Sequence, residues 1–263
     1  SAKIKKEDVD MIILATVTPD YFAQGAACIV QHKLGLKKIP CFDLNAACTG
    51  FIYGLEVAYS LVKSGLYKNV LVIGAETLSR IVDMRNRNTC VLFGDGAAAA
   101  IVGQVEEGYG FLGLSIGAEG EDDMILKIPA GGSKKPNTEE TIKNRENFVV
   151  MKGQEVFKFA VSTLPKVTLD ALEKAKIEVK DLSWVFPHQA NSRIIEAAAK
   201  RMKFPIERFY MNLSRYGNTS SASVGIALGE AIEKGLVKKG DNIALTGFGG
   251  GLTYGSAIIK WAY

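Results

Sequence analysis

The sequence predicts an α/β fold made of two duplicated halves with mixed, mainly parallel sheets. Short apolar runs of strand length alternate with segments of helical periodicity, which is the pattern of strands covered by helices on both faces. The 27 glycines, set against only 7 prolines, suit many tight turns between strands and helices. Two segments, 54–76 and 225–248, share a helix, a lysine-containing turn and a strand in the same order. Such a repeat indicates an internal duplication.

The composition argues against several other classes of protein. With 263 residues and 48% hydrophobic side chains, the chain can bury a large core. A net charge of +4 gives no reason to expect nucleic acid as a partner. Four cysteines without a C-x-x-C pair and only two histidines favour reduced thiols in the cytoplasm and argue against a metal site. No apolar run has the length needed to cross a bilayer, so no membrane partner is expected.

The first half, residues 1–115, begins with a polar lead-in and continues as alternating strands and helices. A continuous apolar run such as 11–16 is typical of a strand that is buried on both faces. The expected helices are 26–34 and a long helix whose apolar positions recur from Phe51 to Val62. The expected strands are 11–16, 41–44, 69–74, 90–93 and 97–102, the last two separated by a tight turn at 94–96.

Residues 116–150 are expected to form an irregular connection, because this stretch is more polar and contains loop sequences such as Gly131-Gly132-Ser133. The second half, residues 151–263, repeats the alternation of the first. Its expected elements are helices at 154–176, 192–202 and 224–234 and strands at 184–186, 208–213, 242–247 and 256–261.

Cys48 lies at the turn between the strand 41–44 and the helix that follows. Two alanines before it leave room for a sharp bend of the backbone. A thiol at the start of a helix faces unpaired N–H groups and the positive end of the helix dipole, which lower its pKa and favour the thiolate. Cys48 is therefore a candidate nucleophile. The alternative is a small buried residue at a tight crossing of elements, which is the commoner fate of a free cysteine.

Two more candidates follow from the duplication. Asn218 occupies the same kind of strand-to-helix turn in the second half that Cys48 occupies in the first, and His188 follows a strand end. Ligands in open α/β sheets bind beyond the carboxyl ends of strands, so the three side chains are expected to converge. Each also has a structural alternative, since His188 suits a buried histidine bonded to a carbonyl and Asn218 suits a helix cap.

Five motifs of the chain resemble those of one enzyme family. They are N-A-A-C-T-G-F, F-G-D-G-A, P-H-Q-A-N-S-R-I, G-N-T-S-S-A-S and G-F-G-G-G-L-T-Y-G-S. The chain from Met11 onward resembles the thiolase-fold condensing enzymes, most closely the β-ketoacyl-[acyl-carrier-protein] synthase III family. The resemblance implies a five-layer αβαβα fold. It also implies that a strand and a helix that precede Met11 in the family are missing from this chain.

The resemblance implies an acyltransferase that starts type II fatty acid synthesis. Cys48 would accept an acyl group from an acyl-CoA primer, with acetyl-CoA as the default. His188 and Asn218 would then hold the enolate that forms when malonyl-acyl carrier protein loses CO₂, and the enolate would attack the acyl-cysteine. An asparagine cannot act as a base near neutral pH, so Asn218 fits stabilisation of an enolate better than proton abstraction. No cofactor is implied, because both thioesters are substrates.

The resemblance also assigns binding residues. The backbone N–H groups of Cys48 and Gly251 would form the oxyanion hole. Tyr21, Phe22 and Ala23 would help to close the acyl pocket, and a homodimer is expected, with the strand 69–74 continuing across its two-fold axis. The implied coenzyme A contacts are Arg87, Gly153, Ala190, Asn191 and Arg193. The implied docking residues for the acidic carrier protein are Lys158, Arg193, Lys200 and Arg201. Helical spacing places the last three on one face of a single helix.

Two alternatives remain open in the sequence, and a third, a degradative thiolase, is disfavoured. Degradative thiolases resemble this pattern but carry a second cysteine in the last glycine loop, where this chain has Gly249-Gly250-Gly251-Leu252. A papain-like cysteine hydrolase has the same order of Cys, His and Asn, although its local signature around the cysteine is absent here. A non-catalytic relative would bind acyl-CoA or carrier protein only, and the intact catalytic trio argues against it.

Overall fold

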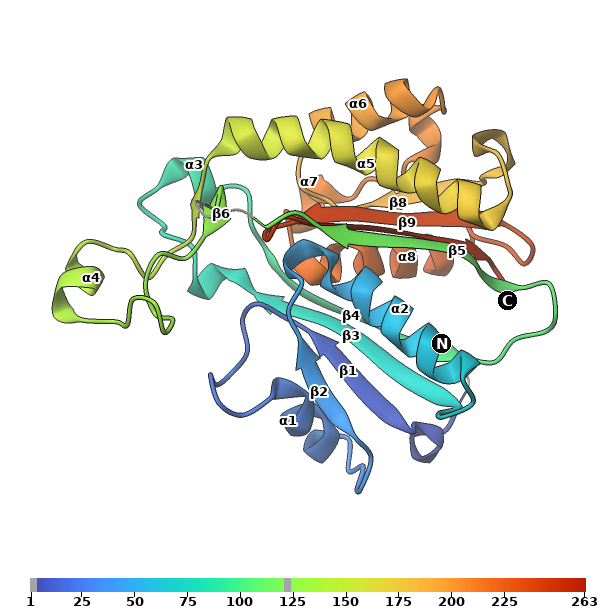
Figure 1. The fold of residues 1–263 in the computed structure, drawn as a ribbon, viewed down its shortest axis with the longest axis horizontal. Helices are drawn as coiled ribbons and strands as arrows, with labels where there is room; N and C mark the ends of the chain where they lie inside the picture. The colour runs from blue at the N-terminus through green and yellow to red at the C-terminus, as the bar shows by residue number, and fades with distance from the viewer. Residues whose placement is uncertain (1–3, 121–123) are drawn as a thin grey trace.

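The computed structural model describes residues 4–120 and 124–263, so the first positions of the polar lead-in and residues 121–123 of the connection lie outside it. Five layers are stacked on one another (Figure 1). Helix α1 (Ala26–Lys33) covers one sheet, α2 (Gly50–Lys63) and α8 (Ser223–Glu233) form the middle layer, and a second sheet is covered by α5 (Gly153–Ala175) and α6 (Ser192–Met202). The expected αβαβα arrangement is confirmed.

The first sheet has the strand order β2-β1-β3-β4. Strand β1 pairs in parallel with β2 and β3, and β3 pairs antiparallel with β4. Every residue of β1 is buried, as the continuous apolar run predicts, because α1 lies on one face of the sheet and α2 on the other. The bounds of its strands are Met11–Ala15 for β1, Cys41–Leu44 for β2, Asn69–Thr77 for β3 and Asp95–Gly103 for β4.

The second sheet has the order β5-β10-β9-β8. Here only β8 and β9 are parallel, while β10 runs antiparallel to both β9 and β5. The sheets are therefore mixed, as predicted. Among the described strands, pairing is mainly parallel in the first sheet and mainly antiparallel in the second. The bounds of its strands are Gly110–Ala118 for β5, Trp184–Pro187 for β8, Asn242–Gly249 for β9 and Thr253–Lys260 for β10.

The middle layer is thin because glycines let its helices approach the sheets closely. A Cβ atom on Gly54 of α2 would lie 2.9 Å from Val72 Cγ1, and one on Gly225 of α8 would lie 2.6 Å from the Cβ of Ala98. Both distances are shorter than carbon atoms tolerate. The main hydrophobic cluster fills this layer between the two sheets, and the two smaller clusters lie under α1 and under α5 and α6.

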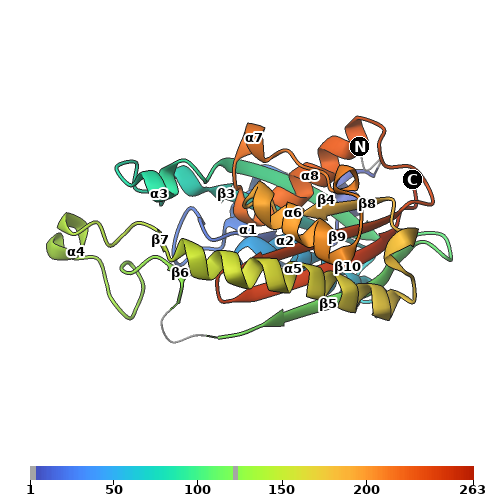
Figure 2. The same ribbon diagram turned by 90° about the horizontal axis from the view of Figure 1, so that it is seen from above.

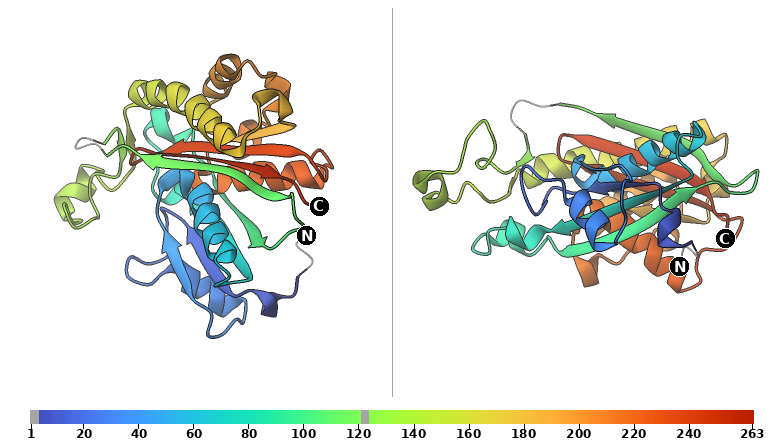
Figure 3. Two further views of the ribbon diagram at one scale, coloured as in Figure 1. Left: turned by 45° about the vertical axis from the view of Figure 1, so that its right-hand side comes forward. Right: turned by 90° about the horizontal axis from the view of Figure 1, so that it is seen from below.

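The duplication is visible in the order of elements. Helix α2 leads into β3, and α8 leads into β9 in the same way (Figure 3). The division of the chain into the ranges 1–115, 116–150 and 151–263 stays a prediction. Strand β5 nevertheless runs across position 115 and pairs with β10, so the second sheet contains residues from both sides of that boundary.

The connection between the halves carries an arm that extends beyond the layers (Figures 1 and 2). It contains the helix α4 (Glu139–Lys143). Arg145 pairs with Asp83 in the body, and this guanidinium lowers the pKa of the Asp83 carboxyl to about 2. The short remaining elements are η1 Lys6–Asp8, η2 Ala47–Thr49, η3 Leu78–Arg80, α3 Arg87–Cys90, β6 Leu126–Lys127, β7 Val150–Met151, η4 Val179–Asp181, η5 Ile206–Arg208, α7 Leu213–Tyr216 and η6 Ser220–Ala222.

Three predicted elements are wrong. The expected strand 90–93 is the end of α3 and a turn, because Asn86 caps a short helix there by accepting the N–H of Asn88 at 3.1 Å. The expected turn 94–96 lies largely within β4. The expected strand 208–213 is a 3₁₀ turn and the start of α7, with only Phe209 forming a bridge to Val185. Strand β5, which the sequence analysis assigned in part to the irregular connection, is an additional long strand.

Candidate active site

The three residues predicted to act together line one pocket. Cys48, His188 and Asn218 are 6%, 2% and 8% exposed, and they share a pocket of about 90 Å³. Most of the remaining wall is apolar, which keeps water away from the reacting groups. The other lining residues are Leu92, Phe93, Leu126, Met151, Gly153, Val156, Phe157, Phe159, Ala190, Asn191, Ile194, Phe248, Gly249 and Leu252.

Cys48 lies in the middle of the 3₁₀ turn η2, between the end of β2 and the start of α2, as predicted. Asn45 shapes this turn, because its Oδ1 accepts the N–H of Ala47 at 3.2 Å and Ala47 has a φ of 46°. The last glycine loop closes against it. A Cβ atom on Gly249 would lie 2.7 Å from the backbone N of Cys48, so only glycine fits there.

The predicted depression of the Cys48 pKa is wrong. Burial raises the pKa of the thiol to about 12, and the charge of Glu76 adds to the rise, while a hydrogen bond with Ser220 opposes it. The position before a helix is as expected, but the loss of hydration outweighs it because the thiolate is the form that burial penalises. Cys48 is therefore a protonated thiol at neutral pH.

His188 follows the end of β8, and its backbone N–H donates to the carbonyl of Thr246 at 2.8 Å. Its ring is held by the first residue of α8, since Nδ1 lies 2.6 Å from Ser223 Oγ. The ring also packs edge-on against Phe248, with centroids 5.4 Å apart. Burial lowers the pKa of His188 to about 3, so the imidazole is neutral at physiological pH.

Asn218 begins the corresponding turn of the second half. Its backbone N–H donates to the Leu92 carbonyl at 2.8 Å, and its carbonyl accepts the N–H of Gly94 at 2.9 Å. Its side-chain Oδ1 accepts the N–H of Ser220 at 2.8 Å, so the oxygen of the amide is used within the turn. This assignment leaves the NH₂ group as the donor available to the pocket.

Sequence reasoning missed two polar residues behind the trio. Ser223 holds the His188 ring, and it stands in the quoted motif G-N-T-S-S-A-S without having been given a role. Glu76, at the end of β3, is 4% exposed and accepts hydrogen bonds from Thr16, Val17, Thr18 and Ser221. A carboxylate directly after an apolar strand is the signal that could have drawn attention to it.

The predicted binding residues divide into two groups. Gly153, Ala190 and Asn191 line the pocket, whereas Arg87 and Arg193 are exposed and lie outside its lining. Gly251 was predicted to contribute to the oxyanion hole. Among the described residues, its neighbours Gly249 and Leu252 line the pocket, but Gly251 itself does not. The predicted primer residues Tyr21, Phe22 and Ala23 are exposed on the segment before α1 and also lie outside the lining, Phe22 being 89% exposed.

The predicted docking residues lie on the outermost helical layer. Lys158 is on α5, and Arg193, Lys200 and Arg201 are on α6, and all of them are exposed. Arg201 differs from the others because its Nη1 donates to the Val161 carbonyl at 2.7 Å, which ties α6 to α5. Arg193 lies in the first turn of α6, beside the lining residues Asn191 and Ile194, whereas Lys200 and Arg201 lie in its last turn.

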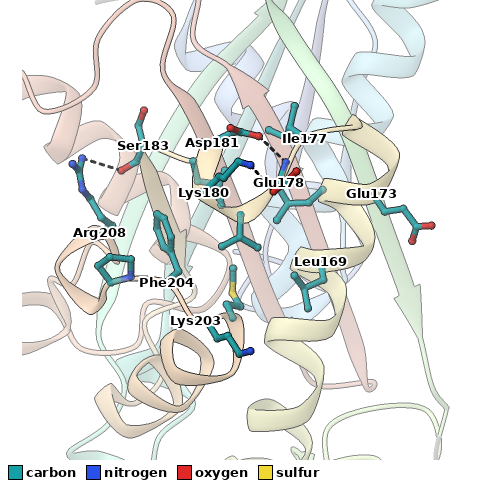
Figure 4. A pocket seen from close by; sticks show the side chains of 15 residues that line it. Leu169, Glu173, Ile177, Glu178, Lys180, Asp181, Ser183, Lys203, Phe204 and Arg208 are labelled. Carbon is teal, nitrogen blue, oxygen red and sulfur yellow. Dashed lines mark hydrogen bonds and ion pairs between the residues drawn. The ribbon is translucent and has the colours of Figure 1, made fainter.

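A larger hollow lies at the other end of α5. It measures about 970 Å³ and is lined by residues such as Leu169, Phe204 and Arg208 (Figure 4). Two of its charged residues, Lys180 and Glu178, form an ion pair at 2.9 Å. Among the residues that the structure describes, none lines both this hollow and the Cys48 pocket. Across residues 4–120 and 124–263, no cluster of three or more His, Cys, Asp or Glu side chains suits a metal ion, and none of the helices there could serve as a membrane-crossing segment.

Comparisons with known families match both halves of the chain. The family model described as 3-oxoacyl-[acyl-carrier-protein (ACP)] synthase III matches residues 42–120. The model for the C terminal of the same synthase matches residues 172–261. Cys48 falls within the first match, and His188 and Asn218 fall within the second.

Individual relatives agree with these matches. A β-ketoacyl-[acyl-carrier-protein] synthase III from Fusobacterium nucleatum subsp. nucleatum is 90% identical over 263 residues, which are 100% of this chain and 80% of the relative. One from Caldanaerobacter subterraneus subsp. tengcongensis is 54% identical over 99% of this chain and 79% of its own length. The crystal structure of 3-oxoacyl-[acyl-carrier-protein] synthase III from Aquifex aeolicus VF5 has a TM-score of 0.88 and 45% identity, covering 97% of this chain and 78% of that one.

Proposed function

The chain belongs to the 3-oxoacyl-[acyl-carrier-protein] synthase III family, and we propose that Cys48, His188 and Asn218 are its catalytic residues. The enzyme is an acyltransferase that condenses an acyl primer with malonyl-acyl carrier protein in fatty acid synthesis. One observation carries the assignment of the residues. Side chains from both halves of the chain, far apart in sequence, line the same buried apolar pocket.

In the first half-reaction, Cys48 takes the acyl group from coenzyme A. The sulfur of Cys48 attacks the thioester carbonyl, the bond to the coenzyme A sulfur breaks, and the thiol proton of Cys48 ends on that leaving sulfur. The exchange is balanced without a net base, which suits a thiol whose pKa is about 12. We assign the oxyanion to the backbone N–H groups of Cys48 and Gly251, since the glycine loop closes directly against the Cys48 turn.

In the second half-reaction, His188 and Asn218 stabilise the enolate. Loss of CO₂ from the malonyl group places negative charge on the thioester oxygen. The NH₂ group of Asn218 is free to donate to it, because the amide oxygen is bound to Ser220. The Nε2–H of His188 is free as well when Nδ1 accepts from the Ser223 hydroxyl. The enolate carbon then attacks the acyl-cysteine carbonyl and releases the Cys48 sulfur as a thiolate, which takes up one proton from water to regenerate the thiol.

The substrates define the partners. Acyl-CoA and malonyl-acyl carrier protein bring both reacting groups, and the chemistry is redox-neutral, so we propose that no cofactor is needed. The volume of about 90 Å³ supports a short primer, with acetyl-CoA as the default. We assign coenzyme A contacts to Gly153, Ala190 and Asn191 in the pocket wall and to Arg87 and Arg193 outside it.

We propose that the acidic carrier protein docks on the basic residues of α5 and α6, which are Lys158, Arg193, Lys200 and Arg201. These four residues are exposed cations, and opposite charges accelerate encounter in a salt-dependent manner. Reversal of Arg193 and Lys200 to Glu should raise the KM for malonyl-acyl carrier protein and leave acylation of Cys48 by acyl-CoA less affected. Reversal of Lys33 and Lys37, near α1 on the opposite outer layer, is the matched control.

A homodimer remains part of the proposal, but the predicted strand cannot form it. Strand β3 is hydrogen-bonded to β1 on one side and to β4 on the other, so 69–74 is not an edge. Strand β2 lies at one end of the described sheet and exposes Phe42, which makes it the better candidate for pairing across a two-fold axis. We propose a cytoplasmic location because the four cysteines are free thiols.

The papain-like hydrolase is not favoured, since the relatives named above are synthases and the layered fold matches theirs. Incubation with labelled acetyl-CoA tests the catalytic assignment. Intact-mass spectrometry should show one acetyl group per chain on Cys48, and addition of malonyl-acyl carrier protein should remove it as the 3-oxoacyl product. A chain that binds acetyl-CoA without forming the adduct would be a non-catalytic relative.

A further inference from the structure

Cys28 and Cys41 form a pair of thiols outside the catalytic pocket. Cys28 is an exposed residue of α1, and Cys41 is the first residue of β2. Their Sγ atoms lie 3.5 Å apart, and the Cys41 thiol is placed to donate to the Cys28 sulfur. Partial burial of Cys41, and after it the neighbouring Cys28 sulfur, raise the pKa of the Cys41 thiol to about 11. Neither residue has a part in the condensation.

The pair is held in place by a contact that does not involve sulfur. Asp43 lies two positions beyond Cys41 on β2, so both side chains point to the face covered by α1. The Asp43 carboxylate accepts the N–H groups of Ala26 and Ala27 at 2.7 Å each. Cys28 is the next residue of that helix. The first turn of α1 is therefore clamped to β2, which keeps the two thiols facing each other.

From this geometry we infer that Cys28 and Cys41 are a dithiol site that a peroxide oxidises to an intrachain disulfide between α1 and β2. The sulfur of exposed Cys28 attacks the peroxide O–O bond, which gives a sulfenic acid and one water. The sulfur of Cys41 then displaces the sulfenic hydroxyl, which leaves as a second water. Two thiols lose two electrons and two protons, and one hydrogen peroxide becomes two waters.

The movement required is small and the competing thiols are less favourably placed. A disulfide needs the sulfur atoms about 2 Å apart, so a change of side-chain rotation and a slight approach of α1 suffice. Cys48 is 6% exposed and lies inside the apolar pocket. Cys90 is half-buried at the end of α3, which is not the helix that Asp43 holds against β2. Oxidation should therefore reach the Cys28–Cys41 pair before it reaches the nucleophile.

The test treats the reduced protein with one equivalent of hydrogen peroxide and then alkylates the remaining thiols after unfolding. We expect the mass to fall by two hydrogens, two cysteines to escape alkylation, and peptide mapping to join Cys28 to Cys41. Cys48 should keep its full capacity for acetylation by acetyl-CoA. Cys28→Ser and Cys41→Ser should each abolish the change, and Cys90→Ser should preserve it. A disulfide that contains Cys48 or Cys90, or that joins two chains, would overturn the inference.

A second measurement does not depend on oxidation. Phenylarsine oxide binds two facing thiols together and releases one water, so the wild type should bind one equivalent with Cys48 still free to be acetylated. Either single serine variant should lose this binding, and Cys90→Ser should not. Because Cys28 is exposed, Cys28→Ser is expected to fold, and its thermal unfolding and acetylation check that directly. Equal binding by wild type and Cys28→Ser would refute the dithiol site.

Discussion

The turns at 45–50 and 218–223 have the same construction and different chemistry. Each begins with an asparagine whose Oδ1 accepts a backbone N–H, at Ala47 in the first turn and at Ser220 in the second. Those residues have nearly the same left-handed φ, 46° and 47°. Each turn continues through a single 3₁₀ turn into a middle-layer helix. By this register the counterpart of Asn218 is Asn45, and the counterpart of Cys48 is Ser221.

The difference lies in which position of each turn faces the pocket. In the first turn the asparagine is exposed and the fourth residue, Cys48, lines the pocket. In the second turn Asn218 lines the pocket, while Ser221 is fully buried and donates to Glu76 at 2.7 Å. A duplicated turn thus supplies the nucleophile in one copy and a hydrogen-bond donor in the other. Position in the turn alone does not make a residue catalytic, since access to the pocket is also required.

The largest expected effect removes the nucleophile. Cys48→Ala should lower condensation by about a million-fold, as for other nucleophiles that act within a catalytic unit. The double variant Cys48→Ala/Ser221→Cys should stay inactive, because position 221 is buried away from the pocket behind Glu76. Intact-mass spectrometry after incubation with acetyl-CoA measures the adduct. An acetyl group at position 221 would show that the two turns are interchangeable after all.

The next effect separates the two asparagines. Asn218→Ala should retain acetylation of Cys48 and lose malonyl decarboxylation by about 10²- to 10³-fold, the usual effect of removing one oxyanion donor. Asn45→Ala removes the corresponding side chain from the first turn and should change decarboxylation by no more than a few-fold, since Asn45 is exposed. Release of labelled CO₂ measures the step. Equal losses in both variants would contradict the division of roles.

The pH dependence of Cys48 should show that burial dominates over the helix terminus. Because its pKa is about 12, the thiolate fraction should rise about tenfold per pH unit near neutrality. Alkylation by iodoacetamide should therefore accelerate about a hundred-fold between roughly pH 7 and pH 9 without a plateau. The folded state keeps this proton above the ordinary thiol pKa of 9.0, so the free energy of unfolding should fall as pH rises beyond that value. A plateau of the rate near neutral pH would indicate a low-pKa thiolate instead.

The smallest expected effect concerns the histidine behind the second turn. Ser223→Ala removes the partner of His188 Nδ1 and should slow decarboxylation about tenfold, the value of one hydrogen bond of ordinary strength. Acetylation of Cys48 should be nearly unchanged. Because burial lowers the pKa of His188 to about 3, the wild-type decarboxylation rate should not change around pH 6.5. A bend of that rate near pH 6.5 would mean that His188 is charged in the working enzyme.

The strongly periodic elements could be predicted from the sequence, and the elements set by distant contacts could not. The range of α6 and the strand core at 11–15 follow from local patterns alone. Strand β5 lies in the middle of the chain and contains several glycines, and its pairing partner is β10 near the C-terminus. Gly113 is needed there because a Cβ atom would lie 2.3 Å from the Ala171 carbonyl of α5. The prediction of a strand at 90–93 was wrong for a related reason. The apolar side chains of Leu92 and Phe93 line the pocket and do not belong to a sheet.

The site shows the same division between local and long-range information. The motifs identified Cys48, His188 and Asn218, and all three line the pocket. Cys48 and His188 follow strands that local patterns define, whereas the strand expected before Asn218 is a 3₁₀ turn and the start of α7. The pKa of Cys48 could not be predicted, because its cause is burial by parts of the chain that lie far away in sequence. Ser223 and Glu76 were missed for a similar reason. Their roles come from partners in other elements, His188 for one and the Thr16 segment for the other.

The glycines of the middle layer have a consequence for how this enzyme can change during evolution. At Gly54 and Gly225 any other residue would push a sheet away from its helix, and the two turns that carry Cys48 and Asn218 would separate with it. The pocket wall is under no such restriction, since Phe93 follows a turn, Met151 lies in the short strand β7 and Phe157 lies near the start of α5. Lineages that acquire longer or branched primers are therefore expected to accumulate substitutions in that wall, while the glycine contacts between the layers stay fixed.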